Sequence, residues 1–162
     1  MDDIITRSAQ SEDVEALANL ITELGYPTSS EDMDRRFEAI SADSSYATLV
    51  AARGGNVLGM VGLHLERFYE SNSSCVRIMA LVVGSEHRGR GVGRILVSAA
   101  EDWARQRGAR EIMLTTHNRR ADAHRFYVSM GYEATGYRFY KPLGGASEVI
   151  RTSEDFPSKH SD

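Results

Sequence analysis

One stretch, residues 82–96, limits what this chain can fold into more than any other. An apolar run typical of a buried strand gives way to a turn rich in glycine and arginine, and a helix pattern follows. The turn carries glycines at alternate positions, Gly89, Gly91 and Gly93. Because glycine has no side chain to cover the neighbouring backbone, such a turn can expose several N–H groups to an anion. The stretch predicts a strand, a phosphate-binding loop and a helix, in that order.

Arginines accompany these glycines. The turn contains Arg88 and Arg90, and Arg94 follows in the first turn of the predicted helix. The unpaired N–H groups at the start of a helix and the positive end of its dipole both favour an anion, and guanidinium groups add charged donors. We therefore expect residues 88–94 to bind a pyrophosphate group.

Two common nucleotide-binding loops also join a strand to a helix through glycines, and neither fits. A Walker loop requires Lys and then Ser or Thr directly after its last glycine, whereas Arg94 and Ile95 follow Gly93. A dinucleotide fingerprint requires G-x-G-x-x-G, and this turn lacks the glycine at the sixth position. The remaining pattern is Arg88-x-x-Gly91-x-Gly93.

The composition is that of an ordinary globular domain. The chain has 162 residues, of which 41% are hydrophobic and 26% charged, and this is enough for one domain with a sizeable core. Its formal net charge is −4, which argues against duplex nucleic acid as the partner because such binding needs surplus Lys and Arg. A cationic substrate suits an acidic chain better.

The sequence carries no signal for secretion or for a membrane. The start, Met1-Asp2-Asp3, lacks the basic and apolar regions of a signal peptide, and no apolar run approaches transmembrane length. The single cysteine, Cys75, cannot form an internal disulfide, and we interpret it as a small, partly buried apolar residue. We expect a cytoplasmic protein that does not contact a membrane.

Hydrophobic periodicity and turn residues predict a mixed α/β chain in the order β-α-α-β-β-β-α-β-α-β. The predicted strands cover residues 4–9, 46–52, 57–67, 75–83, 111–116 and 132–143, and the predicted helices cover residues 14–24, 33–40, 92–107 and 118–130. The helix after the glycine turn joins two strands into a βαβ unit, which requires parallel pairing. Residues 144–162 have no sustained period and are predicted to be a tail.

Two motifs, placed within this order of strands and helices, resemble those of one enzyme family. The spacing Arg88-x-x-Gly91-x-Gly93 resembles the coenzyme A pyrophosphate signature, Gln/Arg-x-x-Gly-x-Gly/Ala, of the GCN5-related N-acetyltransferases (GNAT). A later stretch is similar to the family's Asn…Ala…Phe-Tyr…Gly-Phe motif, with Asn118, Ala121 or Ala123, Phe126-Tyr127 and Gly131-Tyr132 in its positions. The resemblance implies the GNAT fold, a mixed sheet flanked by helices, with the domain in residues 1–143 and the tail in residues 144–162.

The resemblance also implies acetyl-CoA as the cosubstrate and the residues that bind it. In the family the pantetheine arm lies where the fourth strand splays from the fifth, which assigns backbone contacts to Leu81 and Val83. Asn118 would reach the pantetheine or a bridging water. The residues implied to bind acetyl-CoA are Leu81, Val82, Val83, Arg88, Gly89, Arg90, Gly91, Val92, Gly93, Arg94, Asn118 and Tyr127.

Tyr127 matches the tyrosine that protonates the leaving thiolate in many members of the family. A phenol keeps its proton at neutral pH and can donate it when the bound geometry brings it within reach. The alternative is that Phe126 and Tyr127 are both packing aromatics on an amphipathic helix.

The sequence offers no single base for the incoming ammonium. The candidates are His64 and Glu66, which share one face of their strand by alternation, and His117, just after the fifth strand. A chain of water molecules is the alternative. The five histidines do not pair with Cys or carboxylate residues at metal-ligand spacing, so we expect no metal.

Three functions remain open at this point. The first is acetyl transfer from acetyl-CoA directly to a primary amine of a small molecule, in a ternary complex. The second is acetylation of protein N-termini or lysines, and the third is a non-catalytic module that binds or senses acyl-CoA. The acidic residues Glu31, Asp32, Asp34 and Glu38 could line a pocket for a cationic acceptor, or they could form a solvated helix face. The resemblance also suggests a homodimer, with its contact at the closing strand or an exposed sheet surface.

Overall fold

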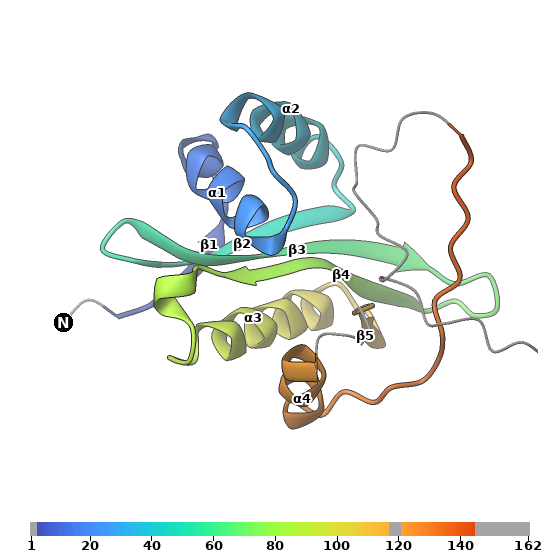
Figure 1. The fold of residues 1–162 in the computed structure, drawn as a ribbon. Coiled ribbons are helices and arrows are strands. Elements are labelled where there is room, and N and C mark those ends of the chain that lie inside the picture. Colours follow the sequence, from blue (N-terminus) through green and yellow to red (C-terminus); the bar gives the residue numbers. More distant parts are fainter. Residues whose placement is uncertain (1–2, 117–120, 145–162) are drawn as a thin grey trace, which may run out of the picture. The chain divides into compact units, whose positions relative to one another are not determined.

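A computed structural model of the chain describes residues 3–116 and 121–144 (Figure 1). The chain divides into two compact units, Met1–Leu114 and Thr115–Asp162. The first unit contains the sheet and three of the helices, and the second contains one helix within its described residues. The two units are treated separately below.

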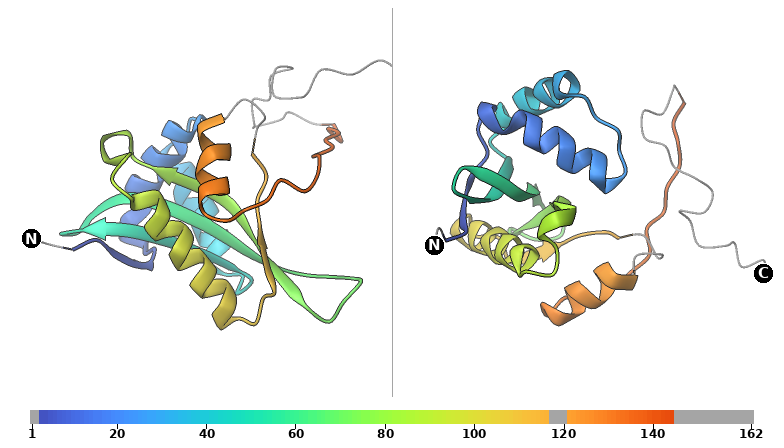
Figure 2. Two further views of the ribbon diagram at one scale, coloured as in Figure 1. Left: turned by 90° about the horizontal axis from the view of Figure 1, so that it is seen from below. Right: turned by 60° about the vertical axis from the view of Figure 1, so that its left-hand side comes forward.

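The first unit is a mixed sheet with helices on both faces. In chain order its elements are β1 (Ile5–Ser8), the 3₁₀ turn η1 (Ser11–Asp13), α1 (Val14–Leu24), α2 (Ser30–Ser41), β2 (Tyr46–Arg53), β3 (Asn56–Arg67), β4 (Ser74–Val83), the 3₁₀ turn η2 (Ser85–His87), α3 (Val92–Gln106) and β5 (Glu111–Met113). The strand order is β1-β2-β3-β4-β5, antiparallel except for the parallel β4–β5 pair. Helices α1 and α2 cover one face and α3 covers the other (Figures 1 and 2). The predicted fold class is confirmed.

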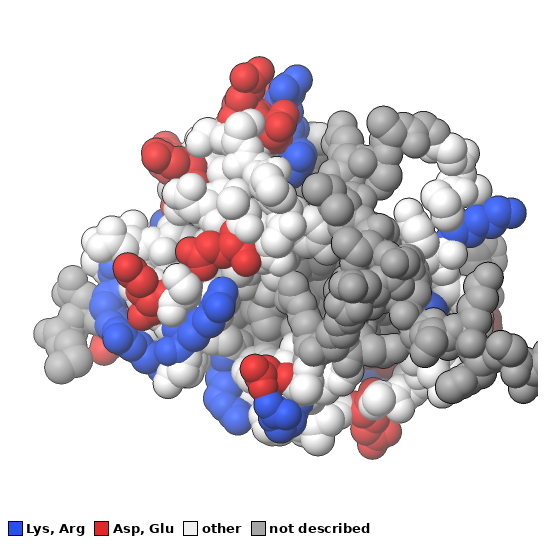
Figure 3. All heavy atoms as spheres, in the orientation of Figure 1, with Lys and Arg blue, Asp and Glu red and all other residues white. Residues whose placement is uncertain are grey.

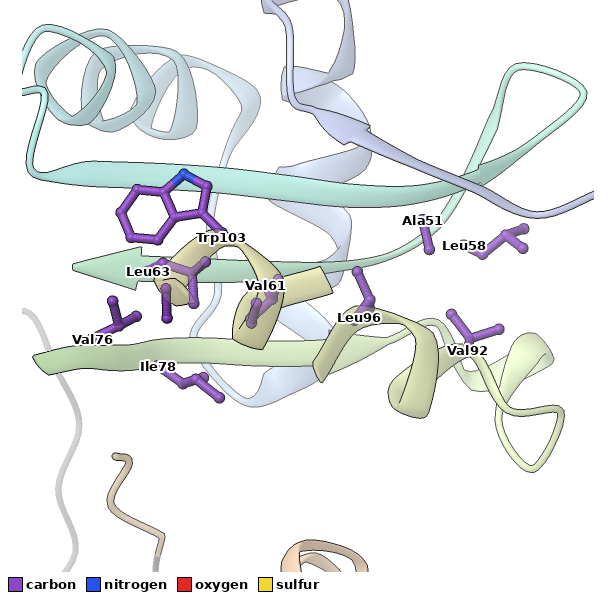
Figure 4. Packing of buried hydrophobic residues seen from close by; sticks show 11 residues of the cluster. Ala51, Leu58, Val61, Leu63, Val76, Ile78, Val92, Leu96 and Trp103 are labelled. Carbon is purple, nitrogen blue, oxygen red and sulfur yellow. The ribbon is translucent and has the colours of Figure 1, made fainter. Parts of the chain in front are cut away.

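Each face of the sheet has its own hydrophobic core. On one face the apolar side of α3, with Leu96 and Trp103, packs against β3 and β4, including Val61 and Val76 (Figure 4). On the other face Leu17 of α1 packs with residues of α2 and the sheet, namely Met33, Val50, Met60 and Val82. Strand β4 contributes side chains to both cores, Val76 and Ile78 to one and Val82 to the other, in agreement with its almost continuous apolar run.

The helix ends follow the local sequence signals. The Ser29 side chain accepts a hydrogen bond from the Asp32 N–H and so caps α2, as the spacing of the two residues predicts. Gly25 adopts a left-handed conformation, with φ of 116°, and ends α1. Helix α1 begins at the predicted residue 14, with Asp13 in the capping position after the 3₁₀ turn that Ser11 begins.

The second unit contains α4 (Ala121–Ser129), which ends before Gly131, a residue with φ of 92°. The predicted start of this helix at residue 118 lies outside the described residues. The predicted closing strand, residues 132–143, is wrong, because this segment has no regular secondary structure. A strand needs a neighbour for its N–H and C=O groups, and no strand among the described residues pairs with this segment. The segment has the side-chain pattern of a strand, with alternating aromatic residues such as the exposed Tyr137 and Phe139, but it lacks a pairing partner among the described residues.

Gly59 allows β3 and β4 to approach closely, and its replacement tests this packing. A Cβ atom at Gly59 would lie 2.8 Å from the Val82 carbonyl oxygen and 3.1 Å from a Leu96 methyl carbon. We expect Gly59→Ala to lower the free energy of unfolding by about 1–3 kcal/mol, because the backbone of β4 cannot move aside as a flexible side chain would. Urea unfolding measures the change. Gly62→Ala is the matched control, because its Cβ would lie 3.9 Å from the nearest atom and should change stability by less than about 1 kcal/mol.

A partly buried ion pair connects β1 with the start of α1. The Asp13 carboxylate accepts hydrogen bonds from Arg7 at 2.7 and 3.0 Å and from the Gln10 N–H at 2.8 Å. These bonds, those from Arg7 first, lower the pKa of the Asp13 carboxyl below its usual value. A depressed pKa in the folded state means that the stabilisation is present at neutral pH and is lost as the pH falls through the folded value.

We therefore expect Asp13→Asn to destabilise the protein by about 2 kcal/mol at pH 7. The difference in free energy of unfolding between wild type and the variant should become smaller below about pH 4, where an ordinary aspartate begins to be protonated in the unfolded chain. Unfolding curves at several pH values test this, with the exposed Asp3→Asn as control. A stability difference that stays constant down to pH 3 would contradict the assignment of this pH-dependent stabilisation to the Asp13 carboxylate.

Candidate active site

Strand β4 has one edge that is only partly paired. Its pairing with β5 covers three positions, Cys75, Val76 and Arg77, against Glu111–Met113. Beyond Arg77, no strand among the described residues pairs with this edge of β4, although β3 pairs with the other edge as far as Val83. The fifth strand is therefore shorter than the predicted 111–116. The result is an open backbone edge from residue 78 to residue 83.

The hydrogen-bond alternation shows which groups face this open edge. The Gly84 N–H donates to the Leu58 carbonyl oxygen at 2.9 Å, so these two residues form a hydrogen-bonded pair. Along an antiparallel ladder, hydrogen-bonded pairs alternate with pairs that are not hydrogen-bonded. Val83 and Leu81 belong to the second kind, so their N–H and C=O groups point away from β3, toward the open edge. Val82 directs its backbone groups toward β3, and its side chain is buried under α1 and α2. The register thus presents Leu81 and Val83, but not Val82, to a ligand along the edge.

The open edge ends at the glycine turn. Gly89 and Gly91 have φ of 71° and 83°, and a Cβ atom at either would meet no other atom within 4 Å. Gly91 precedes α3, whose start has no side-chain cap and no acidic residue in its first turn. Gly93 lies within that first turn, and Val92 beside it is buried. The turn therefore offers an uncovered helix start with room above its backbone, which is what a phosphate group requires.

Arginine side chains gather around this turn (Figure 3). Arg88, Arg90 and Arg94 are all exposed. The Arg88 Nε donates to the Val83 carbonyl oxygen at 3.0 Å, which places one guanidinium group at the junction of the turn and the open edge. All the predicted phosphate-binding positions, residues 88–94, therefore lie in one continuous turn and helix start.

A residue that the sequence analysis missed, Glu23 at the end of α1, contacts this turn. Its carboxylate accepts a hydrogen bond from the Ser85 N–H at 2.9 Å and lies 3.7 Å from the Arg88 guanidinium group. The ion pair is exposed and weak by itself, but the backbone hydrogen bond fixes the start of η2. No local pattern could reveal a contact between residues 62 positions apart.

The predicted base candidates lie in a cluster at the other end of the open edge. Glu66 accepts two hydrogen bonds from Arg77, at 2.8 and 3.0 Å, and its Oε1 lies 3.4 Å from the Nδ1 of His64. The His64 ring stacks on Tyr46 with the ring centroids 4.3 Å apart. His64 is opposite Arg77 in the β3–β4 register, and Arg77 is the last residue of β4 that pairs with β5. The cluster is therefore level with the point where the open edge begins.

Within this cluster the two candidates differ as proton acceptors. The hydrogen bonds from Arg77 lower the pKa of the Glu66 carboxyl below its usual value, with a smaller opposing effect of burial. A carboxylate stabilised in this way is a weak base. The geometry favours His64 over Glu66 as the acceptor of a proton.

A β-bulge follows the cluster. The β3–β4 register shifts between Gly62 and Leu63, and Met79 is the extra residue in β4. Its side chain is 54% exposed, which is unusual for a strand that is otherwise largely buried. An exposed apolar side chain thus lies where the open edge starts.

In the second unit Tyr127 lies on α4 and is half-buried. Its ring makes edge contacts with Phe126 and Tyr132, at centroid distances of 5.2 and 5.5 Å. His124 is exposed, as expected. Asn118 and His117 lie outside the described residues.

The acidic residues of α2 form a solvated face rather than a lined pocket. Glu31, Asp34 and Glu38 are exposed, and Arg35 pairs with Glu31 and Asp32 at 3.4 and 2.9 Å. Neutralisation by Arg35 weakens the hypothesis that these residues attract a cationic acceptor.

The described residues offer neither a membrane span nor a metal site. No helix within residues 3–116 and 121–144 combines the length and the apolar character needed to cross a bilayer. Over those residues, no three His, Cys, Asp or Glu side chains gather as metal ligands.

A mixed sheet with an open β4 edge among the described residues and a glycine turn at the end of that edge agrees with the resemblance to acyl-CoA-dependent transferases. The family model described as Acetyltransferase (GNAT) family matches residues 14–132. The chain belongs to this family and is an acetyl-CoA-dependent N-acetyltransferase.

Three similar proteins extend this comparison. The chain is 35% identical over 142 residues to an aminoalkylphosphonate N-acetyltransferase of Salmonella typhimurium, covering 85% of this chain and 90% of the relative. It is 33% identical over 119 residues to the streptothricin acetyltransferase of Streptomyces lavendulae, covering 73% of this chain and 55% of that protein. A crystal structure of a GNAT family acetyltransferase from Staphylococcus aureus matches with a TM-score of 0.77 and 31% identity, over 88% of this chain and all of that one.

The role of the glycine turn is tested by Gly91→Glu. A side chain there would occupy the open space above the helix start and place a negative charge against the pyrophosphate. We expect coenzyme A binding, measured by calorimetry, to weaken by at least about a hundred-fold, because both the charge and the bulk oppose the anion.

The control for backbone strain is Gly108→Glu. Gly108 has φ of 72° and also has open space beyond its Cβ position, but it lies past the other end of α3. This variant should bear the same strain and keep its affinity. Equal losses of affinity in the two folded variants would contradict the hypothesis that the glycine turn binds the pyrophosphate of coenzyme A.

Proposed function

We propose that this enzyme transfers the acetyl group of acetyl-CoA directly to the primary amine of a small molecule. The observation that carries the proposal is the continuity of the open β4 edge with the glycine turn. The edge offers the backbone groups of Leu81 and Val83, and directly beyond Val83 the chain enters the glycine turn that leads to the uncovered start of α3. A long substrate with a peptide-like arm and a pyrophosphate matches both parts.

In this proposal the first unit binds and orients the acyl donor. Leu81 and Val83 hold the amide groups of the pantetheine arm as a neighbouring strand would. Residues 88–94 bind the pyrophosphate, and a β4 N–H donates to the thioester oxygen as negative charge develops on it. Binding along a fixed strand supplies orientation without a mobile side chain.

The chemistry requires three proton movements. The acceptor ammonium loses a proton to His64 or to water, and the neutral amine nitrogen forms a bond to the acetyl carbon. The nitrogen then loses a second proton to solvent, the bond from the acetyl carbon to sulfur breaks, and Tyr127 donates its phenolic proton to the leaving thiolate and regains a proton from solvent. The products are the N-acetylated amine and coenzyme A with a free thiol.

A compact amine with an anionic group is the first substrate class to test. The support comes from the aminoalkylphosphonate N-acetyltransferase, which matches along nearly its whole length. Release of free thiol from acetyl-CoA should be measured with aminoalkylphosphonates, other small primary amines, streptothricin, aminoglycosides and peptides. Activity with peptides alone would replace this proposal by protein acetylation, and acyl-CoA binding without activity on any amine would favour a sensing module.

The remaining expectations about location and assembly are also proposals. The net charge of −4 supports a role without nucleic acid, and we propose a cytoplasmic protein with a domain in residues 1–143 and a tail in residues 144–162. A homodimer is supported by exposed apolar side chains in the second unit, namely Tyr137, Phe139 and Leu143.

The role of Tyr127 is tested by Tyr127→Phe, which removes the hydroxyl and keeps the ring that contacts Phe126 and Tyr132. General acids commonly contribute about a hundred-fold to ten-thousand-fold, so we expect single-turnover acetylation to slow by that factor. The affinity for acetyl-CoA should stay nearly unchanged. Phe126→Leu is a control for packing alone. A single-turnover rate equal to that of wild type would return Tyr127 to a packing role.

A further inference from the structure

The cluster around His64 is built from three strands, and its members constrain one another. Tyr46 comes from β2, His64 and Glu66 from β3, and Arg77 from β4. Tyr46 and His64 are direct cross-strand partners, as are His64 and Arg77. Because the partners sit on neighbouring strands of one sheet, their backbones cannot shift independently, and the side chains are held in a fixed arrangement.

Glu66 is the centre of this arrangement, and both of its oxygens have donors. Oε1 accepts from the Arg77 Nε at 2.8 Å and faces the His64 Nδ1 at 3.4 Å. Oε2 accepts from the Arg77 Nη2 at 3.0 Å and lies 4.0 Å from the Cys75 sulfur. A bidentate guanidinium fixes the plane of a carboxylate, so Glu66 cannot turn away from the imidazole.

The imidazole itself is fixed on two sides. The stack on Tyr46 sets the plane of the ring, with an interplanar angle of 29°. Glu66, an acceptor when ionised, requires a proton on Nδ1. In the neutral ring the other nitrogen, Nε2, then has a lone pair and no proton. Within the part of the chain that is described, Nε2 makes no hydrogen bond, and the side chain keeps 26% of its surface exposed.

Other titratable groups near this ring are accounted for. Asp43, in the turn before β2, is held mainly by Ser45, whose hydrogen bonds lower the pKa of the Asp43 carboxyl ahead of a smaller effect of His64. Cys75 is buried, and burial raises the pKa of its thiol, so it stays uncharged. The charged groups facing His64 are therefore Glu66, Arg77 and Asp43.

The cluster combines a fixed geometry with access to solvent. Arg77 and Glu66 are about one third exposed, and two parallel hydrogen bonds hold them together. The cluster also lies where β5 leaves β4 and beside the bulge at Met79, which is the inner end of the open edge. A proton acceptor at this place would be close to the acetyl group in the proposed binding mode.

We propose that Glu66 and Arg77 are positioning residues that hold His64 as its Nδ1–H tautomer, so that Nε2 takes the proton from the acceptor ammonium. The inference rests on the proposed function for its chemical meaning, but the tautomer does not depend on any substrate. The proton moves from the ammonium nitrogen to Nε2, giving an imidazolium that Glu66 stabilises, and it leaves to solvent after the acetylated product departs.

The first test is the tautomer, measured by NMR of the ¹⁵N-labelled full chain at a pH where the ring is neutral. His64→Gln identifies the signals of this ring among the five histidines. We expect the Nδ1–H form to predominate in wild type and the Nε2–H form to gain population in Glu66→Ala, because the acceptor for Nδ1–H is gone. Glu70→Ala, an exposed carboxylate in the same hairpin, is the control and should leave the tautomer unchanged.

The second test is kinetic and uses whichever amine is active. We expect Glu66→Ala to lower kcat by about ten-fold to a hundred-fold, and His64→Gln by about a hundred-fold or more, with KM for acetyl-CoA nearly unchanged in both. Arg77→Lys keeps the charge but not the bidentate geometry, and its kcat should fall between wild type and Glu66→Ala.

Each outcome decides a separate part of the inference. An unchanged tautomer in folded Glu66→Ala would overturn the positioning role, and Arg77→Lys gives the same test if Glu66→Ala fails to fold. A changed tautomer with unchanged kcat would overturn the role of His64 as proton acceptor. If wild type acetylates no amine while the tautomer responds as expected, the proposed function fails and the positioning of the ring stands.

Discussion

The structure depends on the unequal pairing of the two edges of β4. One edge pairs with β3 from Ser74 to Val83, while the other pairs with β5 at three positions only. An unpaired strand edge exposes strong hydrogen-bonding groups and is normally a liability. Here the sheet is well packed on both faces, and this packing holds β4 in place although one of its edges lacks a neighbour.

Both ends of this edge are held by contacts from other elements. At the turn, Glu23 of α1 binds the Ser85 N–H, and Arg88 binds the Val83 carbonyl oxygen. At the other end, the bulge at Met79 and the Glu66–Arg77 pair mark the point where β5 departs. A rigid open edge with fixed ends can align a long substrate, and alignment is a large part of the rate enhancement in group transfer. Through Glu23 the turn is also connected with α1, which packs on one face of the sheet.

The local patterns predicted most of the fold because each had a local physical cause. The cap of α2 needed only Ser29 and Asp32, and the end of α1 needed only Gly25. The strand at residues 132–143 was predicted wrongly because alternation describes a side-chain pattern, whereas a strand also requires a partner. The fifth strand was predicted too long for the same reason, since its pairing ends at Met113.

The sequence by itself determined the family and the strand-turn-helix at residues 82–96, because glycine conformation and helix-start chemistry are local. It could also place His64 and Glu66 on one face of a strand. Only the tertiary structure decided that Arg77 binds Glu66 through two hydrogen bonds, that the open edge begins beyond Arg77, and that Glu23 reaches the turn. These features depend on the β3–β4 register, which a single bulge shifts, and on a contact between a helix and a turn that lie 62 residues apart in the sequence. Such long-range geometry is set by the packing of the whole sheet, and no short stretch of sequence encodes it.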